Sequence, residues 1–262
     1  MRFARTVYTE FSKLINSRGW WLILALVILL QPIFGLLEAS QLVSIGLDAT
    51  FETHPELLEA IPPLDYFGFD ATPFGLLPIV IWGGISGASE YKNHNLRSTL
   101  LYSSKRLELF SSKIFALLVS TIAVSFISTF ITVAVRHIGM GGLGLDPLTL
   151  SPVAWMFIGY TVIQWTLLTA LSFSIGLLCR NMIVPLVFLV PQIYNLGNYL
   201  AERWSWGNYL PVAASNLITA TPVKSMPHEP LKGMLILVLW LSTILIMAGY
   251  SFVRNDVGGK YC

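Results

Sequence analysis

The sequence predicts an all-α membrane protein in which an N-terminal amphipathic helix precedes six membrane-spanning helices, with both termini in the cytoplasm. The first observation is composition: 55% of the residues are hydrophobic, 11% are charged, and the mean hydropathy is +0.68. Soluble globular domains carry about 25% charged residues, so this chain has too few charges to solvate such a surface. Two further observations, the length of the uncharged stretches and the distribution of Lys and Arg, predict the spans and their orientation.

Residues 1–18 predict a helix that lies in the membrane interface. Phe3, Val7, Phe11 and Leu14 recur at steps of three and four residues. The opposite face carries polar and basic side chains: Arg2, Arg5, Thr9, Lys13 and Asn16. A helix with one apolar and one basic face is suited to the cytoplasmic surface of a bilayer. The simpler interpretation, a plain membrane anchor, stays open.

Six stretches without Asp, Glu, Lys or Arg are long enough to cross a bilayer, which takes about 20 apolar residues. They are residues 20–37, 71–89, 114–135, 147–179, 181–201 and 233–253. The fourth exceeds one span, so its helix is expected near residues 152–178. Only Arg180 separates the fourth stretch from the fifth, which predicts a tight turn.

The basic residues predict that both ends of the chain are cytoplasmic. With the N-terminus inside, twelve of the sixteen Lys and Arg residues fall on the inner side, as short cytoplasmic loops require. The first outer loop has no Lys or Arg and carries six acidic residues between Asp48 and Asp70. Both cysteines, Cys179 and Cys262, fall on the inner side, where a disulfide is not expected.

No motif in the chain predicts catalysis, a metal site or a bound cofactor. A phosphate-binding Gly-x-x-x-x-Gly-Lys-Ser/Thr loop and a His-Glu-x-x-His motif are both missing. Ser86, within Gly84–Gly87, could suggest an intramembrane nucleophile, but all four histidines are expected in loops, which leaves no base. Because ion-coupled carriers need ionisable groups inside the membrane, the uncharged spans argue against a secondary carrier.

The polar side chains expected within the spans are uncharged. They are Gln164 in the fourth span and Gln192, Tyr194, Asn195 and Asn198 in the fifth. Such amides either hydrogen-bond between helices or line a cavity for an amphipathic substrate, and both interpretations stay open. Phe74 and Trp82, in the second span, are candidates for the same pathway or for packing.

Residues 90–113 form the longest cytoplasmic segment. It holds five of the twelve inner basic residues, two acidic residues and several regularly placed leucines. This pattern predicts two short helices. Since the chain has no nucleotide loop, energy for transport would have to arrive through a protein contact, and this segment is the largest surface available for one.

The chain resembles the permease subunits of type-2 ABC exporters. The likeness rests on the overall layout and on the run Glu90-Tyr91-Lys92-Asn93-His94-Asn95-Leu96-Arg97-Ser98-Thr99-Leu100-Leu101-Tyr102-Ser103-Ser104-Lys105-Arg106, which leads to Lys113. The closing Arg254-Asn255-Asp256-Val257 is similar to the Arg-Asp-Val that ends many such permeases. His94-Asn95 stands where the family has Gly-Thr, and Ser104 where it has Pro.

The resemblance implies an elbow helix at residues 1–18, a permease domain at 19–257 and a cytoplasmic tail at 258–262. The expected partners are two separate ATP-binding subunits, which bind ATP and Mg, a second permease, identical or related, and membrane lipid, without nucleic acid. The second and fifth spans of the two permeases would meet at the pathway. The residues expected to couple to the ATPase are Glu90, Arg97, Thr99, Leu100, Leu101, Lys105 and Arg106.

The expected function is export of a hydrophobic or amphipathic cargo, such as an antibiotic, antimicrobial peptide or lipid-linked molecule, across the plasma membrane. A membrane scaffold or signalling partner that transports nothing is the main alternative. A secondary carrier is a further one.

Overall fold

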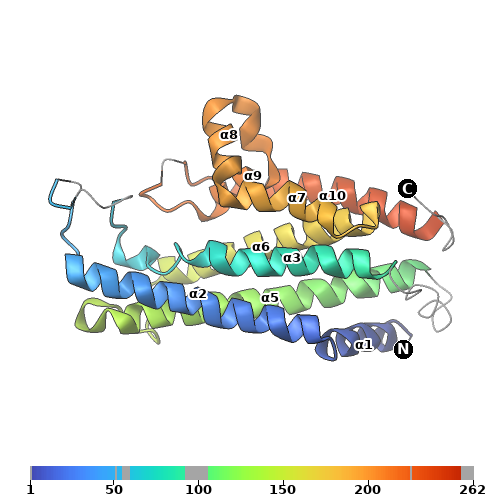
Figure 1. The fold of residues 1–262 in the computed structure, drawn as a ribbon, viewed down its shortest axis with the longest axis horizontal. Coiled ribbons are helices and arrows are strands. Elements are labelled where there is room, and N and C mark those ends of the chain that lie inside the picture. Colours follow the sequence, from blue (N-terminus) through green and yellow to red (C-terminus); the bar gives the residue numbers. More distant parts are fainter. Residues whose placement is uncertain (1, 51, 55–59, 92–105, 225, 255–262) are drawn as a thin grey trace.

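The computed structural model describes residues 2–50, 52–54, 60–91, 106–224 and 226–254. Over these residues the regular structure is helical (Figure 1). The elements are α1 (Arg2–Ile15), α2 (Arg18–Ile45), α3 (Thr72–Ser89), α5 (Arg106–Gly139), α6 (Pro152–Cys179), α7 (Ile183–Pro191), α8 (Gly197–Arg203), α9 (Pro211–Thr219) and α10 (Pro230–Arg254). Short turns lie at Leu64–Tyr66, Gly141–Leu143, Gln192–Leu196 and Ser205–Tyr209.

Six helices are long and apolar enough to cross a membrane, which confirms the predicted number of spans. They are α2, α3, α5, α6, the interrupted helix Ile183–Arg203 and α10. Figure 1 shows α2, α3, α5 and α6 running along the long axis, while α8 stands out from the bundle. The end of α10 lies at the same end of the bundle as α1.

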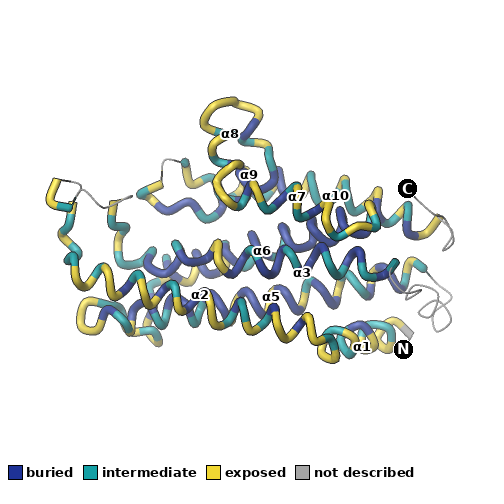
Figure 2. The backbone as a smooth tube through the Cα atoms, in the orientation of Figure 1, coloured by how far each residue is buried: buried dark blue, intermediate teal, exposed yellow. Residues whose placement is uncertain are grey.

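The core of the bundle lies where α3 packs against α6. Figure 2 shows buried positions concentrated along these two helices, whereas α10 and the α7–α8 region leave much of their surface exposed. The helix backbones approach closely because α3 presents glycine: a Cβ built at Gly83 would lie 2.5 Å from the carbonyl oxygen of Thr169, and one at Gly87 2.2 Å from that of Phe173. The Ser172 hydroxyl also donates to the Val80 carbonyl, at 2.7 Å.

The helices of the first and third spans extend further than the uncharged stretches. Helix α5, at 34 residues, is about 50 Å long, against a hydrocarbon thickness of about 30 Å. Consequently Glu38 lies within α2, and Lys113 and Arg136 lie within α5. The uncharged stretches predicted as spans are thus flanked by charged residues within the same helices. The helices can continue because each of these charged groups pairs with an opposite charge from another helix.

At one end of the bundle, Arg136 forms the ion pair with Glu38 and also stacks over the Phe67 ring, 5.6 Å from its centroid. The next residue, His137, was expected in a loop but lies in α5, where it is buried. Its Nδ1 accepts a hydrogen bond from the backbone N–H of Leu145 at 3.1 Å, which holds the loop after the helix.

The segment between the fifth and sixth spans contains a buried helix that the loop assignment missed. Helix α9 begins at Pro211, as helices often do, and packs against α6 and α10. Its apolar side chains Val212, Leu217 and Ile218 are buried. This short helix brings polar side chains from the connecting segment into the body of the protein.

Candidate functional site

The fifth span is broken in its second half. Helix α7 ends at Pro191, and the π-type turn Gln192–Leu196 contains two residues outside the helical region. Tyr194 has φ −83° and ψ 51°, while Asn195 has φ 72° and ψ −11°, in the left-handed region. Asn accepts this conformation more readily than most residues. The break turns α8 away from the axis of α7.

Gln192 spans the break and connects it to α9. Its side-chain N–H donates to the Phe188 carbonyl at 2.7 Å, in the last turns of α7. Its side-chain oxygen accepts from the backbone N–H of Val212 at 3.4 Å. The buried Gln192 amide therefore satisfies one backbone carbonyl of α7 and one backbone N–H of α9.

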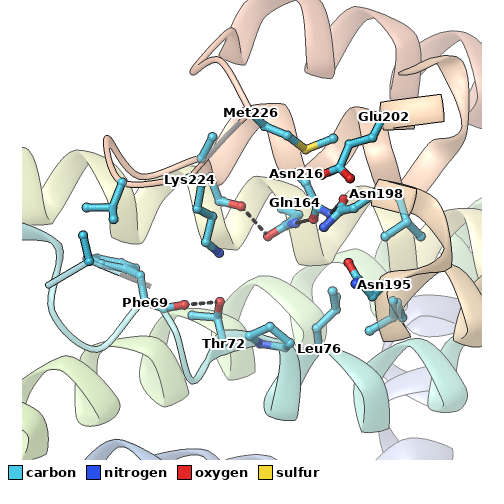
Figure 3. Close-up of a pocket in the computed structure, with 17 residues that line it drawn as sticks. Phe69, Thr72, Leu76, Gln164, Asn195, Asn198, Glu202, Asn216, Lys224 and Met226 are labelled. Carbon is cyan, nitrogen blue, oxygen red and sulfur yellow. Dashed lines mark hydrogen bonds between the residues drawn. The ribbon is translucent and has the colours of Figure 1, made fainter. Parts of the chain in front are cut away.

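A chain of polar side chains connects α6, α8 and α9 (Figure 3). The Gln164 amide donates to the Ser215 hydroxyl at 3.1 Å and accepts from the Thr219 hydroxyl at 3.3 Å. The Asn216 amide donates to the Asn198 side-chain oxygen at 2.7 Å. Gln164 and Asn198 thus hydrogen-bond between helices, one of the two interpretations that the sequence leaves open.

The same amides line a cavity of about 520 Å³, which we call the amide pocket. Its walls come from the start of α3, the middle of α6, the break in the fifth span, α8, α9 and the segment after it. Glu202 and Lys224 supply charged groups, and Leu76 and Met226 supply apolar surface. The volume is typical of a small-molecule site. A ligand here would meet several hydrogen-bond donors and acceptors beside a smaller apolar area.

A second group of polar side chains, all of them charged, lies at the end of the bundle where α1 meets α3 and α5. Lys113 contacts Glu10 of α1 at 2.6 Å and Glu90, at the end of α3, at 2.5 Å. Lys13 contacts the other oxygen of Glu10 at 2.6 Å. We call Glu10, Lys13, Glu90 and Lys113 the ion cluster; it joins three elements that are distant in the sequence.

Charge attraction dominates at Glu10. Burial raises the pKa of its carboxyl, but the Lys113 ammonium, together with hydrogen bonds from Lys113 and Lys13, outweighs burial and holds this pKa below its ordinary value. The carboxylate therefore stays ionised and keeps α1 attached to α5.

The model of a family described as ABC-2 family transporter protein matches residues 6–197, most of the chain. The chain belongs to this family. A search among curated proteins finds no match. As an ABC-2 protein, the chain is a membrane subunit of the permease type, of a family that works with ABC ATP-binding subunits and generally has no ATPase site of its own.

The structure brings only some of the predicted pathway residues of this ABC-2 permease together. Gln164, Asn195 and Asn198 line the amide pocket. Gln192 does not line it but accepts a hydrogen bond from the backbone N–H of Val212, which does. Tyr194 is 66% exposed and Phe74 is 41% exposed, so both lie on the outer surface of the single chain.

Trp82 is buried away from the amide pocket, with its ring 5.4 Å from that of Trp20. Sequence reasoning also missed three residues of the polar network: Ser215, Asn216 and Thr219. Ser215 and Asn216 lie four and three residues before Thr219, and Pro211 precedes all three. This spacing after a proline was the available signal for a helix with a polar face.

The structure describes only two of the residues predicted to couple to an ATPase. Glu90 lies in the ion cluster, and the Arg106 guanidinium donates to the Val253 carbonyl at 3.1 Å, which connects the start of α5 to the end of α10. Residues 106–113 are the first turns of the long helix α5 and not a separate short helix. The remaining predicted coupling residues lie outside the described residues: Arg97, Thr99, Leu100, Leu101 and Lys105.

Within the described part of the chain, no group of three or more His, Cys, Asp or Glu side chains could hold a metal ion. The exposed Cys179 is a free thiol at the end of α6. Gly84 and Gly87 of α3 pack closely against α6 and the segment after it, whereas Ser86 lies between them in the sequence and lines a separate cavity.

Proposed function

We propose that this ABC-2 protein is the permease subunit of an ATP-driven exporter that moves a hydrophobic or amphipathic molecule out of the cell. The observation that carries the proposal is the amide pocket at the broken fifth span. The pocket presents the side-chain amides of Gln164, Asn195 and Asn198 to a passing molecule, which an entirely apolar span would not do. Irregular backbone at membrane depth is tolerated where it is buried in protein or lines a cavity.

The lining of the amide pocket supports an amphipathic cargo. Leu76, Ile193 and Met226 offer apolar contacts, while Gln164 and Asn198 offer amides. A cargo with one apolar and one hydrogen-bonding side would use both. Because the amides already pair with one another, they could exchange these bonds for bonds to a cargo without being left unsatisfied.

We propose that two permeases pair through their second and fifth spans. In support, Phe74 on the second span and Tyr194 on the fifth are large aromatic side chains exposed on the single chain. Phe74 stacks on Phe34 with ring centroids 3.9 Å apart, which gives it a firm position on the surface. Exposed aromatic side chains of this kind are frequent anchors of protein interfaces.

We propose that the ATP-binding subunits dock on residues 90–113 and that the elbow helix, residues 1–18, moves with them. The ion cluster supports a mechanical connection, since Glu90 at the start of the segment and Lys113 at its end both lie in it, together with Glu10. A displacement of the segment would therefore be transmitted to α1, α3 and α5. Leu100 and Leu101 are proposed to fill an apolar groove on the ATPase.

The first experiment is purification of the tagged permease from its native membrane, followed by reconstitution and ATPase assays with a panel of amphipathic compounds. An ABC ATP-binding subunit should copurify, and some compounds should stimulate hydrolysis. Asn198→Leu should raise the stimulating concentration roughly tenfold, as expected for one lost buried hydrogen bond. Asn208→Leu, outside the pocket, is the matched control and should change nothing.

A second variant separates coupling from cargo binding. Leu100→Asp with Leu101→Asp should release the ATPase or uncouple hydrolysis from transport, whereas Lys105→Glu with Arg106→Glu tests attraction to anionic lipid. Normal transport by the leucine double variant would contradict the docking assignment. Absence of any copurifying ATPase would favour a membrane scaffold or a secondary carrier.

A further inference from the structure

A second cavity, of about 540 Å³, opens at the ion cluster, and we call it the elbow pocket. It lies between α1, the start of α2, the end of α3, α5 and α6. Its apolar walls include Leu14, Trp82, Leu117 and Phe173, and its polar end carries the four residues of the ion cluster. It shares no lining residue with the amide pocket.

One face of α3 carries three buried polar atoms without a hydrogen-bond partner, and all three residues line the elbow pocket. The atoms are the Trp82 indole N–H, the Ser86 hydroxyl and one carboxylate oxygen of Glu90. The residues are spaced four apart, so they stand on one side of the helix and extend over about 12 Å. Trp82 and Glu90 are 6% and 5% exposed.

Unpaired polar atoms of this kind are rare in folded proteins, because a buried donor or acceptor without a partner weakens the fold. A single such atom could reflect a local packing compromise. Two of them, on Ser86 and Glu90, lie one helical turn apart on the wall of one cavity and indicate a missing partner at its polar end.

The unpaired Glu90 oxygen identifies the kind of partner that is missing. The ion cluster holds two carboxylates, Glu10 and Glu90, and two ammoniums, Lys113 and the half-exposed Lys13. Both ammoniums contact Glu10, whereas within the cluster Glu90 is contacted by Lys113 alone, through one oxygen. The other Glu90 oxygen is buried without a donor, and the strongest donor to a carboxylate is a cation.

We propose that the elbow pocket binds an amphipathic primary amine. Its ammonium donates to the free Glu90 oxygen and to the Ser86 hydroxyl, and its apolar body lies along Trp82, Leu117 and Phe173. Two sources have this chemistry: a membrane lipid with an amine headgroup and a free long-chain amine. The proposal does not depend on the exporter function, because it concerns a different cavity.

The test uses the full transporter complex in phosphatidylcholine nanodiscs and a long-chain primary alkylamine that carries a photoactivatable diazirine on its chain. The alkylamine should label peptides of α3, α5 or α6 that line the elbow pocket. A diazirine probe of equal length that ends in a carboxylate should label them at least tenfold less, because its charge repeats that of the buried carboxylates.

The matched variants are Glu90→Gln and Glu108→Gln, which remove the same charge inside and outside the pocket. Glu90→Gln should lower labelling by the alkylamine roughly tenfold, the effect of one charge-assisted hydrogen bond, while Glu108→Gln should leave it unchanged. Ser86→Ala is a smaller change and should lower labelling a few-fold. Size-exclusion chromatography of each variant complex separates loss of binding from loss of assembly.

Competition distinguishes the two sources. If phosphatidylethanolamine in the nanodisc suppresses labelling, the natural ligand is an amine-headed lipid; if only unlabelled alkylamine does, it is a free amine. Either result supports the site. Equal labelling by the amine and the carboxylate, or full labelling of the Glu90→Gln complex, would overturn it. So would a high-resolution structure with ordered water on all three α3 atoms together with no specific labelling.

Discussion

At the scale of single residues, Lys113 occupies a buried position between two carboxylates. Its ammonium is shared between two carboxylates, Glu10 and Glu90, that come from different helices and are themselves buried. Removing one partner from a buried ion pair leaves an uncompensated charge, which costs more than the pair contributes when intact. Lys13, in the same cluster, is half-exposed and contacts Glu10 from three residues away.

We expect Lys113→Met to lower the free energy of unfolding by about 3–5 kcal/mol, because two buried carboxylates then repel each other without a cation between them. Lys13→Met is the matched control and should cost less than about 1 kcal/mol, as exposed pairs do. The measurement is thermal or denaturant unfolding of the purified protein in detergent. Equal effects of the two variants would contradict the central role of Lys113.

The lowered pKa of Glu10 predicts how attachment of α1 depends on pH. When folding lowers a carboxyl pKa, the stabilisation is present above the pKa of the unfolded chain, about 4.5, and is lost as pH falls through the folded value. We therefore expect α1 to stay docked at pH 5 and to detach only at clearly lower pH. Distances between spin labels at Tyr8→Cys and Phe115→Cys report the docking. In a Glu10→Gln background this acid-induced change should disappear.

Asn195, in the break of the fifth span, has a left-handed backbone conformation that most residues disfavour. With φ at 72°, a residue that has a Cβ and no local hydrogen-bonding group is disfavoured by about 1–2 kcal/mol, whereas glycine is not. We expect Asn195→Ala to lower the unfolding free energy by about 1 kcal/mol and Asn195→Gly to leave it nearly unchanged. Differential scanning fluorimetry compares the two. Greater stability of the alanine variant would show that the break straightens.

At the scale of elements, the interface between α3 and α6 depends on close backbone contact. The three glycines of the seam on α3, Gly83, Gly84 and Gly87, each leave room for an atom of α6 or of the segment after it. Small residues at such crossings allow van der Waals contact between backbones, which is the main source of helix association in a membrane. Trp82 of α3 and Glu90, the residue after its last turn, line the elbow pocket.

We expect Gly87→Ala to push α3 and α6 apart, because the new methyl group would lie 2.2 Å from the Phe173 carbonyl oxygen. Gly159→Ala is the control in α6: a methyl group at this position would have no neighbour within 4 Å, so the change should be neutral or stabilise by about 0.5–1 kcal/mol. Unfolding in detergent and the yield of assembled complex are the measurements. Wild-type behaviour of Gly87→Ala would refute tight packing there.

At the scale of the whole molecule, the orientation in the membrane remains a prediction from the distribution of Lys and Arg. We expect Asp65 and Pro227 on the outer side and Lys105 and Cys262 on the inner side. In a Cys179→Ala background, four chains each carry one cysteine: at position 65, 105 or 227 with Cys262 removed, or the native Cys262 alone. Intact cells are treated with an impermeant thiol reagent. Labelling at 65 and 227 but not at 105 or 262 is the expected result. The reverse pattern would invert the topology.

The sequence alone determined the number and the approximate positions of the spans. Hydropathy is a sum over consecutive residues, so a stretch such as 233–253 can be assigned as a span without reference to the rest of the chain. The amides Gln164, Asn195 and Asn198 could likewise be singled out, because uncharged polar groups are conspicuous in an apolar span. Membership of the ABC-2 family agrees with the likeness drawn from the layout and from residues 90–106.

Only the tertiary structure decided which polar groups meet. Lys113 pairs with Glu10, which is 103 positions away in the sequence, and with Glu90, which is 23 positions away. The hydrogen bond between Gln164 and Ser215 likewise depends on α9, a helix in a segment that the sequence predicted to be a loop. Hydrogen bonds and ion pairs act over a few ångströms between groups of fixed geometry, so local composition cannot specify their partners. Glu38, Lys113 and Arg136 lie within α2 and α5, where opposite charges from other helices compensate their charges.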